Sequence, residues 1–124
     1  MNTVIAEAIE EKRLMAAVVA QAIKDACIAP MTKTVKNKKV LRIRWDAATA
    51  MYFLFSTEES GVDAYALWLD FDVKMFREKL LKKCSSYSHD PYLNDDQKRN
   101  FMRNYRLFQG LSANWRYQDD EDDI

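Results

Sequence analysis

Residues suited to acid–base, nucleophilic or metal chemistry are few in this sequence, and they are scattered along it. The only histidine, His89, is followed by Asp90, but adjacent residues rarely face each other, and one histidine is too few for a structural zinc site. Cys27 and Cys84 lie far apart and belong to no CxxC pair, so we expect two buried free thiols in a reducing compartment. We therefore expect neither an enzyme nor a bound cofactor or metal.

Nucleic-acid recognition is a different chemistry, and segment 62–83 carries the pattern for it. The segment predicts two short helices around an acidic corner, as in a helix-turn-helix, whose second helix lies in the major groove. Ala66 supplies the small residue of the first helix, Asp70 occupies the turn position usually held by glycine, and Asp72 caps the second helix. Two linked amphipathic helices also occur in most helical domains, which is the structural alternative. The predicted DNA contacts are the outward residues of the second helix, Lys74, Arg77, Glu78 and Lys79, with Arg77 suited to a bidentate contact with guanine.

Two further basic segments are candidates for phosphate contacts. Residues 31–45 hold six basic side chains and no acidic one, which is typical of an arm that lies along a nucleic-acid backbone. The alternative is a solvated loop that pairs with residues 46–72, which hold six acids and no base. The arm consists of Lys33, Lys36, Lys38, Lys39, Arg42 and Arg44. A second backbone-contact candidate, or else a plain solvated face, lies on the last predicted helix with Lys98, Arg99, Arg103 and Arg106.

The C-terminal segment combines aromatic and acidic residues. Trp115 and Tyr117 are candidates for contact with a partner or a second subunit, because aromatic anchors carry much of the energy of interfaces. The last seven residues have a net charge of minus five, and we expect residues 118–124 to be a disordered acidic tail. The formal net charge of the whole chain is zero, so any attraction to nucleic acid must come from local patches.

These side chains are expected on a mainly helical scaffold. The 124 residues include only two glycines and two prolines, too few for the turns of a strand-rich domain, and favour an all-α fold with a single compact domain over residues 1–117. We expect about five helices and a small basic β-hairpin within 31–45, with a mobile basic loop as the alternative to the hairpin. In that hairpin residues 32–35 pair with residues 40–44 around a turn at 36–39.

The helix boundaries follow from hydrophobic period and from capping residues. A first helix is expected over residues 3–28, with a stripe that includes Ile5, Ala8, Ile9, Val19 and Ala22 turned inward. A second helix is expected after Asp46 as its N-cap to residue 55, and a last helix over 96–109, capped by Asn94 or Asp95 and ended by Gly110. The aromatic residues of the middle segment are expected mainly in the core, with base stacking as the alternative: Trp45, Tyr52, Phe53, Phe55, Trp68 and Phe71.

No segment predicts export or membrane insertion. The N-terminus has acidic residues before its apolar run and lacks the pattern of a secretion signal, and the apolar run at 14–20 is too short to cross a bilayer. We therefore expect a cytoplasmic protein without a membrane partner.

The segments DAATAMYFLFS and ALWLDFDVKMFREKLL, preceded by EKRLMAAVVAQAIKDA, resemble a pattern in small bacteriophage and prophage helical proteins. The likeness covers most of residues 8–82 and implies a phage origin and a helical fold rather than an activity. We expect a phage-encoded DNA-binding regulator whose partner is double-stranded DNA. The alternative is a small phage protein that binds a host polymerase, nuclease or defence component. Because specific DNA readers of this type usually bind as symmetric dimers, the long first helix or the tail around Trp115 is a candidate homodimer interface.

Overall fold

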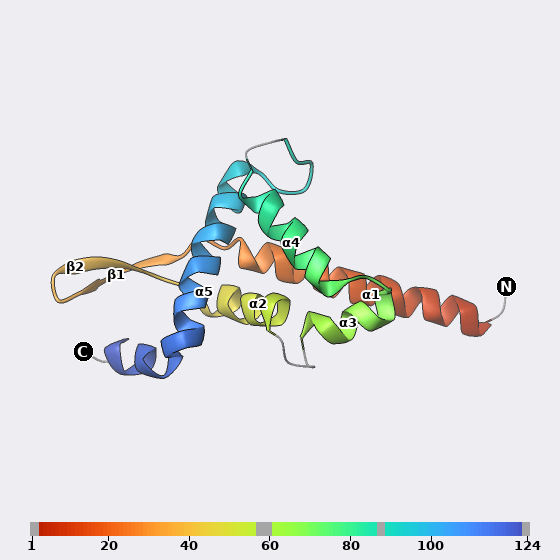
Figure 1. The fold of residues 1–124 in the computed structure, drawn as a ribbon, viewed down its shortest axis with the longest axis horizontal. Helices are drawn as coiled ribbons and strands as arrows, with labels where there is room; N and C mark the ends of the chain where they lie inside the picture. Colours follow the sequence, from red (N-terminus) through yellow and green to blue (C-terminus); the bar gives the residue numbers. More distant parts are fainter. Residues whose placement is uncertain (1–2, 57–60, 87–88, 123–124) are drawn as a thin grey trace.

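The computed structural model describes residues 3–56, 61–86 and 89–122, with side chains through residue 110. Within them the protein is a mainly helical single domain of five helices and one two-stranded antiparallel sheet, as the composition predicted. Figure 1 shows α1 along the long axis of the molecule, with the hairpin projecting beyond the helices at one end. The elements are α1 (Thr3–Ala26), β1 (Met31–Val35), β2 (Lys38–Arg42), α2 (Trp45–Phe55), α3 (Val62–Leu69), α4 (Val73–Cys84) and α5 (Asp95–Asp122).

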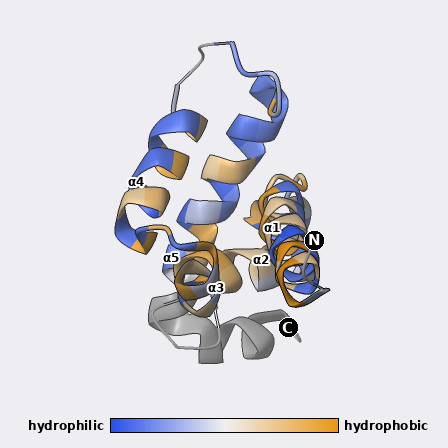
Figure 2. Cartoon of the chain, turned by 90° about the vertical axis from the view of Figure 1, so that its right-hand side faces the viewer, coloured by the Kyte–Doolittle hydropathy of each residue, from blue (hydrophilic) through white to orange (hydrophobic). Residues whose placement is uncertain are grey.

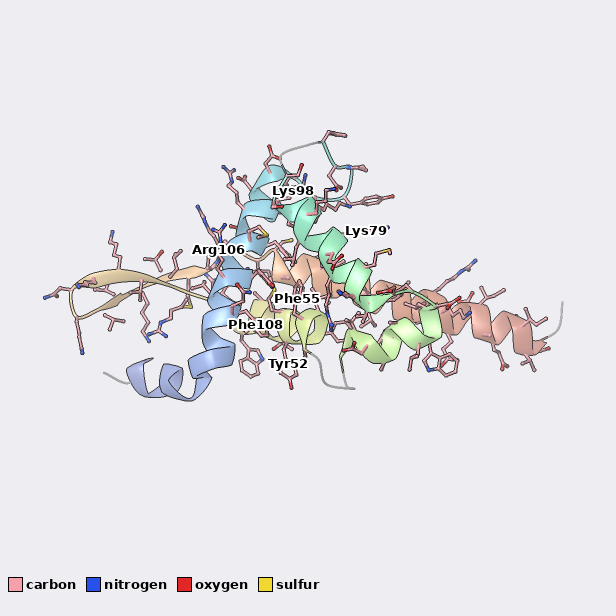
Figure 3. The ribbon with its side chains drawn as sticks, in the orientation of Figure 1. Tyr52, Phe55, Lys79, Lys98, Arg106 and Phe108 are labelled. Atoms are coloured by element: carbon pink, nitrogen blue, oxygen red, sulfur yellow. The ribbon has the colours of Figure 1, made fainter. Side chains whose placement is uncertain are left out.

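The hydrophobic core lies where the C-terminal half of α1 meets α2, α4 and α5. Helix α2 is central to it, because Met51 and Leu54 are fully buried between the other helices. Phe55 extends the core towards α5, where its ring packs against Tyr105 with centroids 4.8 Å apart (Figure 3). The buried cluster consists of Ala22, Ala26, Cys27, Ala50, Met51, Leu54, Leu80, Cys84, Leu93 and Phe101.

Local capping chemistry sets the start of α4 and of α5, as predicted. The Asp72 carboxylate accepts a hydrogen bond of 2.9 Å from the amide of Met75 and caps α4. Asp70 adopts the left-handed conformation, with φ 55° and ψ 55°, at the corner between α3 and α4. At the start of α5, the amide of Gln97 donates to Asn94 Oδ1 at 2.8 Å, and the amide of Asn94 donates to Gln97 Oε1 at 2.9 Å. This reciprocal pair is a capping box.

Other boundaries differ from the expectation. Helix α2 begins at Trp45, so Asp46 lies in its first turn rather than at its N-cap. Helix α5 continues through Gly110 to Asp122, since a lone glycine costs a helix only about 1 kcal/mol and does not end it. Residues 118–122 of the expected acidic tail thus lie within the bounds of α5, and residues 123–124 lie outside the described residues.

The end of α1 depends on a distant polar side chain. Asn104 of α5 is fully buried, and its Nδ2 donates hydrogen bonds of 2.8 Å to the carbonyl of Ala26 and 2.7 Å to that of Ile28. These two carbonyls belong to the turn that leaves the helix, where the last carbonyl groups lack intrahelical partners. Asn104 therefore satisfies the C-terminus of α1, which ends at Ala26 rather than at Ile28.

The predicted interior is corrected at two places. Ile5, Ala8 and Ile9 in the first half of α1 are exposed, because no described element packs on that end of the helix; the buried residues of α1 are Val19, Ala22 and Ala26. The middle aromatic residues also divide: Phe53 and Phe55 pack against the core, and the half-buried ring of Phe71 lies 5.2 Å from that of Phe76. In contrast, Trp45, Tyr52 and Trp68 are exposed.

Candidate nucleic-acid interface

The basic arm forms a tight antiparallel hairpin. Its strands pair Met31 with Arg42 at the open end and Val35 with Lys38 next to the turn. Only Lys36 and Asn37 lie in the turn, both at positive φ (52° and 65°), which is the backbone of a type I′ hairpin. The hairpin prediction is therefore confirmed and the mobile-loop alternative is wrong. The turn has two residues rather than the expected four, because asparagine tolerates positive φ and a type I′ turn matches the twist of the strands.

The cationic side chains of the hairpin fall into two groups. Lys36, Lys38 and Lys39 at the tip are exposed and have no carboxylate partner within the described parts of the chain. Nearer the body, Lys33 and Arg42 are half-buried and engaged with neighbouring groups. The tip is thus the part of the hairpin that is open to a large anion.

Arg44 and Trp45 lie where the hairpin joins the helical body. The Nε of Arg44 donates a 3.1 Å hydrogen bond to the carbonyl of Ala29, which ties the two ends of the hairpin together. The next side chain, Trp45, is 82% exposed at the first turn of α2. Tyr52 lies two helical turns further on the same face of α2 and is also exposed. An aromatic face therefore adjoins the cationic hairpin. Sequence periodicity had instead assigned Trp45 and Tyr52 mainly to the core.

Helix α4, the predicted recognition helix, presents a different picture. The Nε of Arg77 donates to the carbonyl of Leu54 at 2.8 Å, and one terminal nitrogen donates to the carbonyl of Ser56 at 2.6 Å. The same nitrogen lies 3.1 Å from the Asp63 carboxylate, and the Arg77 side chain is only 18% exposed. The guanidinium is turned inward onto the end of α2 and the start of α3. This placement argues against the expected base contact by Arg77, because its Nε and one terminal nitrogen already donate within the fold.

The remaining contacts predicted on α4 stay at the surface. The exposed residues are Lys74, Glu78 and Lys79, and the acidic Glu78 comes between the two lysines in the sequence. Figure 3 shows Lys79 on the outer side of α4, on a different element from the hairpin. Near the end of this helix the Nζ of Lys83 forms a 2.8 Å ion pair with Asp90 and lies 5.5 Å from the ring centroid of Tyr92. Helix α4 thus offers separate lysines without the arginine that would have read a base.

The predicted contacts on α5 also separate. Lys98 is 1% exposed, and its Nζ donates to the carbonyl of Ser86 at 3.3 Å, so its assignment to a phosphate-binding surface is wrong. Arg99 pairs with Asp96 in the first turns of the helix, whereas Arg103 and Arg106 are exposed. Lys98 and Arg106 lie about two turns apart on α5, as Figure 3 shows. The tail contacts Trp115 and Tyr117 lie beyond the described side chains.

The two cysteines behave as interior groups. Burial raises the pKa of Cys27 from 9.0 to about 12, with a further contribution from nearby Cys84. Burial likewise raises the pKa of Cys84, to about 11, although Lys98 and Lys83 act in the opposite direction. Both thiols stay protonated at neutral pH and are poor nucleophiles or metal ligands.

Within residues 3–56, 61–86 and 89–122, no group of three or more histidine, cysteine, aspartate or glutamate side chains is placed to hold a metal ion. In the same ranges no helix combines the length and apolar character needed to cross a bilayer.

No known family, no curated protein and no solved structure matches this chain. The residues themselves are therefore the basis for any functional assignment.

Proposed function

We propose that this protein binds nucleic acid through its basic hairpin, with α4 in a secondary role. The observation that carries the proposal is the cluster of Lys36, Lys38 and Lys39 at the exposed tip of a projecting β-ribbon (Figure 1). Two-stranded ribbons have the dimensions to enter the major groove of duplex DNA. Lysines on such a ribbon neutralise phosphates and release counterions, which gives affinity without sequence choice.

Trp45 supports the same assignment. The Trp45 indole is exposed where the cationic ribbon joins the helical body. There it can stack on a nucleobase that is unpaired or lies at the end of a duplex. The occupied guanidinium of Arg77 argues against base-specific reading by α4. We therefore favour a backbone-binding protein with weak sequence preference over the sequence-specific regulator expected from the helix-turn-helix pattern.

The first experiment is a mobility-shift titration with a random duplex at two salt concentrations. The triple variant Lys36→Ala/Lys38→Ala/Lys39→Ala should weaken binding at low salt, and its slope of log affinity against log salt should be shallower by about 2 to 3, because about 0.9 counterion is released per phosphate contact. The matched control is Lys74→Ala/Lys79→Ala/Lys82→Ala, which removes the same charge from exposed positions on α4. Because α4 has only a secondary role in the proposal, its variant should lose less affinity than the hairpin variant; equal losses would mean that overall charge or α4, rather than the hairpin, governs binding.

The alternative function is binding to a host protein, and exposed Trp45 favours it independently of charge. Interfaces concentrate their binding energy in such aromatic anchors. If the wild-type protein fails to bind duplex or single-stranded nucleic acid at low salt, this alternative takes the lead. The phage origin implied by the resemblance is part of both proposals, and isolation of the protein from its natural host with its bound molecules would test it.

A further inference from the structure

One face of helix α2 presents two aromatic rings to solvent. Trp45 is 82% exposed, and Tyr52, which is labelled in Figure 3, is 46% exposed. Because Tyr52 follows Trp45 by two helical turns, the two side chains lie on the same face, about 10 Å apart along the helix axis. Thr49, which lies between them on that face, is exposed as well. The face therefore offers two flat apolar surfaces at a fixed separation.

The Trp45 end of this face adjoins positive charge. Arg44, the residue before α2, is exposed; its Nε donates to the carbonyl of Ala29, and it has no carboxylate partner within the described parts of the chain. Lys39 at the hairpin tip is six positions before Trp45 and hence within about 20 Å of it, at about 3.4 Å per residue. The exposed acid next in sequence, Asp46, is turned about 100° around the helix from the indole. A polyanion bound along the hairpin can therefore extend to Trp45.

The other exposed tryptophan among the described side chains lies in a different environment. Trp68 is 57% exposed on α3, a helix without a basic residue whose colouring in Figure 2 is mostly apolar. Figure 1 shows α3 on the far side of α2 from the hairpin. Trp45 thus combines an accessible ring with adjacent cations, and Trp68 provides a matched control for it.

Accessible rings beside cations discriminate between single-stranded and double-stranded nucleic acid. Within a duplex each base is covered on both faces by its neighbours, so a side chain can stack only on an unpaired base or at a duplex end. The bases of a single strand can turn outward, and every base has a face on which an aromatic ring can stack. The separation of the two rings, about 10 Å, corresponds to roughly three nucleotides of a stacked strand at about 3.4 Å each. One strand can therefore reach both rings.

We propose that the ligand of this surface is a single-stranded nucleic acid, with phosphates on the hairpin-tip lysines and Arg44 and with bases stacked on Trp45 and Tyr52. The inference rests on the proposed nucleic-acid function and narrows its ligand. The lysines supply an attraction that is common to every polyanion. The rings of α2 add affinity for a strand whose bases are accessible, with little choice of sequence, because all four bases can stack.

Two ligands with the same phosphates isolate the stacking contribution. One is an oligothymidine of about 20 nucleotides, longer than common single-strand sites, and the other is a sugar–phosphate chain of the same length without bases. Fluorescence anisotropy at low salt should show that Trp45→Ala weakens binding of oligothymidine by roughly 5- to 100-fold, the size of one base–aromatic stack, and leaves binding of the base-free chain unchanged. Trp45→Phe should recover part of the loss. The matched control Trp68→Ala removes an exposed indole from α3 and should bind as the wild type does.

A relaxed closed circular duplex, which has no ends and no unpaired strand, completes the test. Wild type and Trp45→Ala should bind this circle equally, and an equal loss on the circle and on oligothymidine would overturn the stacking role of the indole. An oligouridine of the same length distinguishes RNA from DNA as the strand, and a loss in Trp45→Ala with either one supports the inference.

The outcomes separate this inference from the proposed function. If Trp45→Ala binds oligothymidine as tightly as the wild type does, or if the wild type binds the base-free chain equally well, the single-strand inference is wrong, whereas hairpin binding, tested by the lysine variants, stands. If the wild type binds no polynucleotide at all, the nucleic-acid function itself is wrong. An unchanged far-ultraviolet dichroism spectrum shows that the variants remain folded.

Discussion

The guanidinium of Arg77 joins three parts of the fold that are distant in sequence. It donates to two carbonyls at the C-terminal end of α2 and pairs with Asp63 in the first turn of α3. The positive charge of Arg77 suits the carbonyls of α2, because the C-terminal end of a helix is the negative pole of its dipole. It also suits the negative carboxylate of Asp63. Arg77 is therefore a structural residue, in a position where the pattern of outward cations had suggested a DNA contact.

Replacement of Arg77 should accordingly reduce stability. We expect Arg77→Ala to lower the free energy of unfolding by about 2 to 4 kcal/mol, because it leaves two carbonyls and a half-buried carboxylate without a partner. Arg77→Lys should recover only part of the loss, since an ammonium cannot reach all three acceptors as a planar guanidinium does. Urea unfolding measures both, with Lys79→Ala as the control that should change stability by less than about 0.5 kcal/mol. Wild-type stability in Arg77→Ala would show that these contacts contribute nothing.

The buried thiols should make the protein sensitive to alkali. Because the pKa of Cys27 is raised from 9.0 to about 12 and that of Cys84 to about 11, both groups hold their protons more tightly in the folded state. Their contribution to stability is therefore complete below pH 9 and is lost as the pH rises from 9 through 11 to 12. We expect the double variant Cys27→Ala/Cys84→Ala to lose less unfolding free energy than wild type between pH 8 and pH 10.5. Parallel pH curves for the two proteins would contradict the assigned pKa shifts.

At the scale of the element, the hairpin depends on its two-residue turn. A two-stranded ribbon is marginally stable alone, so the positive φ of Lys36 and Asn37 is a large part of what holds the strands in register. The sequence did predict strands from alternation and β-branched residues. It placed the turn two residues too long, because the four residues from Lys36 to Lys39 are all polar and none is glycine.

Charge-neutral substitutions at the turn separate the shape of the hairpin from its charge. Asn37→Val should weaken the hairpin, because a β-branched residue is strained at positive φ, whereas Asn37→Gly should preserve or stabilise it. If the ordered ribbon is what binds nucleic acid, Asn37→Val should bind more weakly than wild type in the mobility-shift titration at unchanged net charge. The glycine variant should bind at least as well as wild type. Equal affinity for both would mean that the lysines act without the ribbon.

At the scale of the whole molecule, a net charge of zero conceals two separate surfaces. The cationic hairpin projects at one end of α1, and the apolar stripe with Ile5 and Ile9 projects at the other (Figure 1). The core between them contacts neither surface directly. Substitution of Ile5 or Ile9 should therefore leave nucleic-acid binding by the hairpin unchanged in the mobility-shift titration.

Sequence alone determined the local elements of this protein, because their signals are local. Asp72 caps α4, and Asn94 with Gln97 begins α5, through contacts that span three residues. Asp70 turns the corner through its own left-handed conformation, with its amide bonded to a carbonyl four residues back. Helical period likewise located the stripe on α1.

Tertiary structure alone decided which side chains are buried or bonded within the fold and which face solvent. Half of the α1 stripe is buried and half is exposed, because packing neighbours come from α2, α3 and α5 rather than from α1. For the same reason periodicity could not distinguish Arg77 and Lys98, which face inward, from Lys74 and Lys79, which face solvent. The acceptors that capture these two cations, the carbonyls of Leu54 and Ser56 for one and of Ser86 for the other, lie 12 to 23 residues away and approach only when the chain folds.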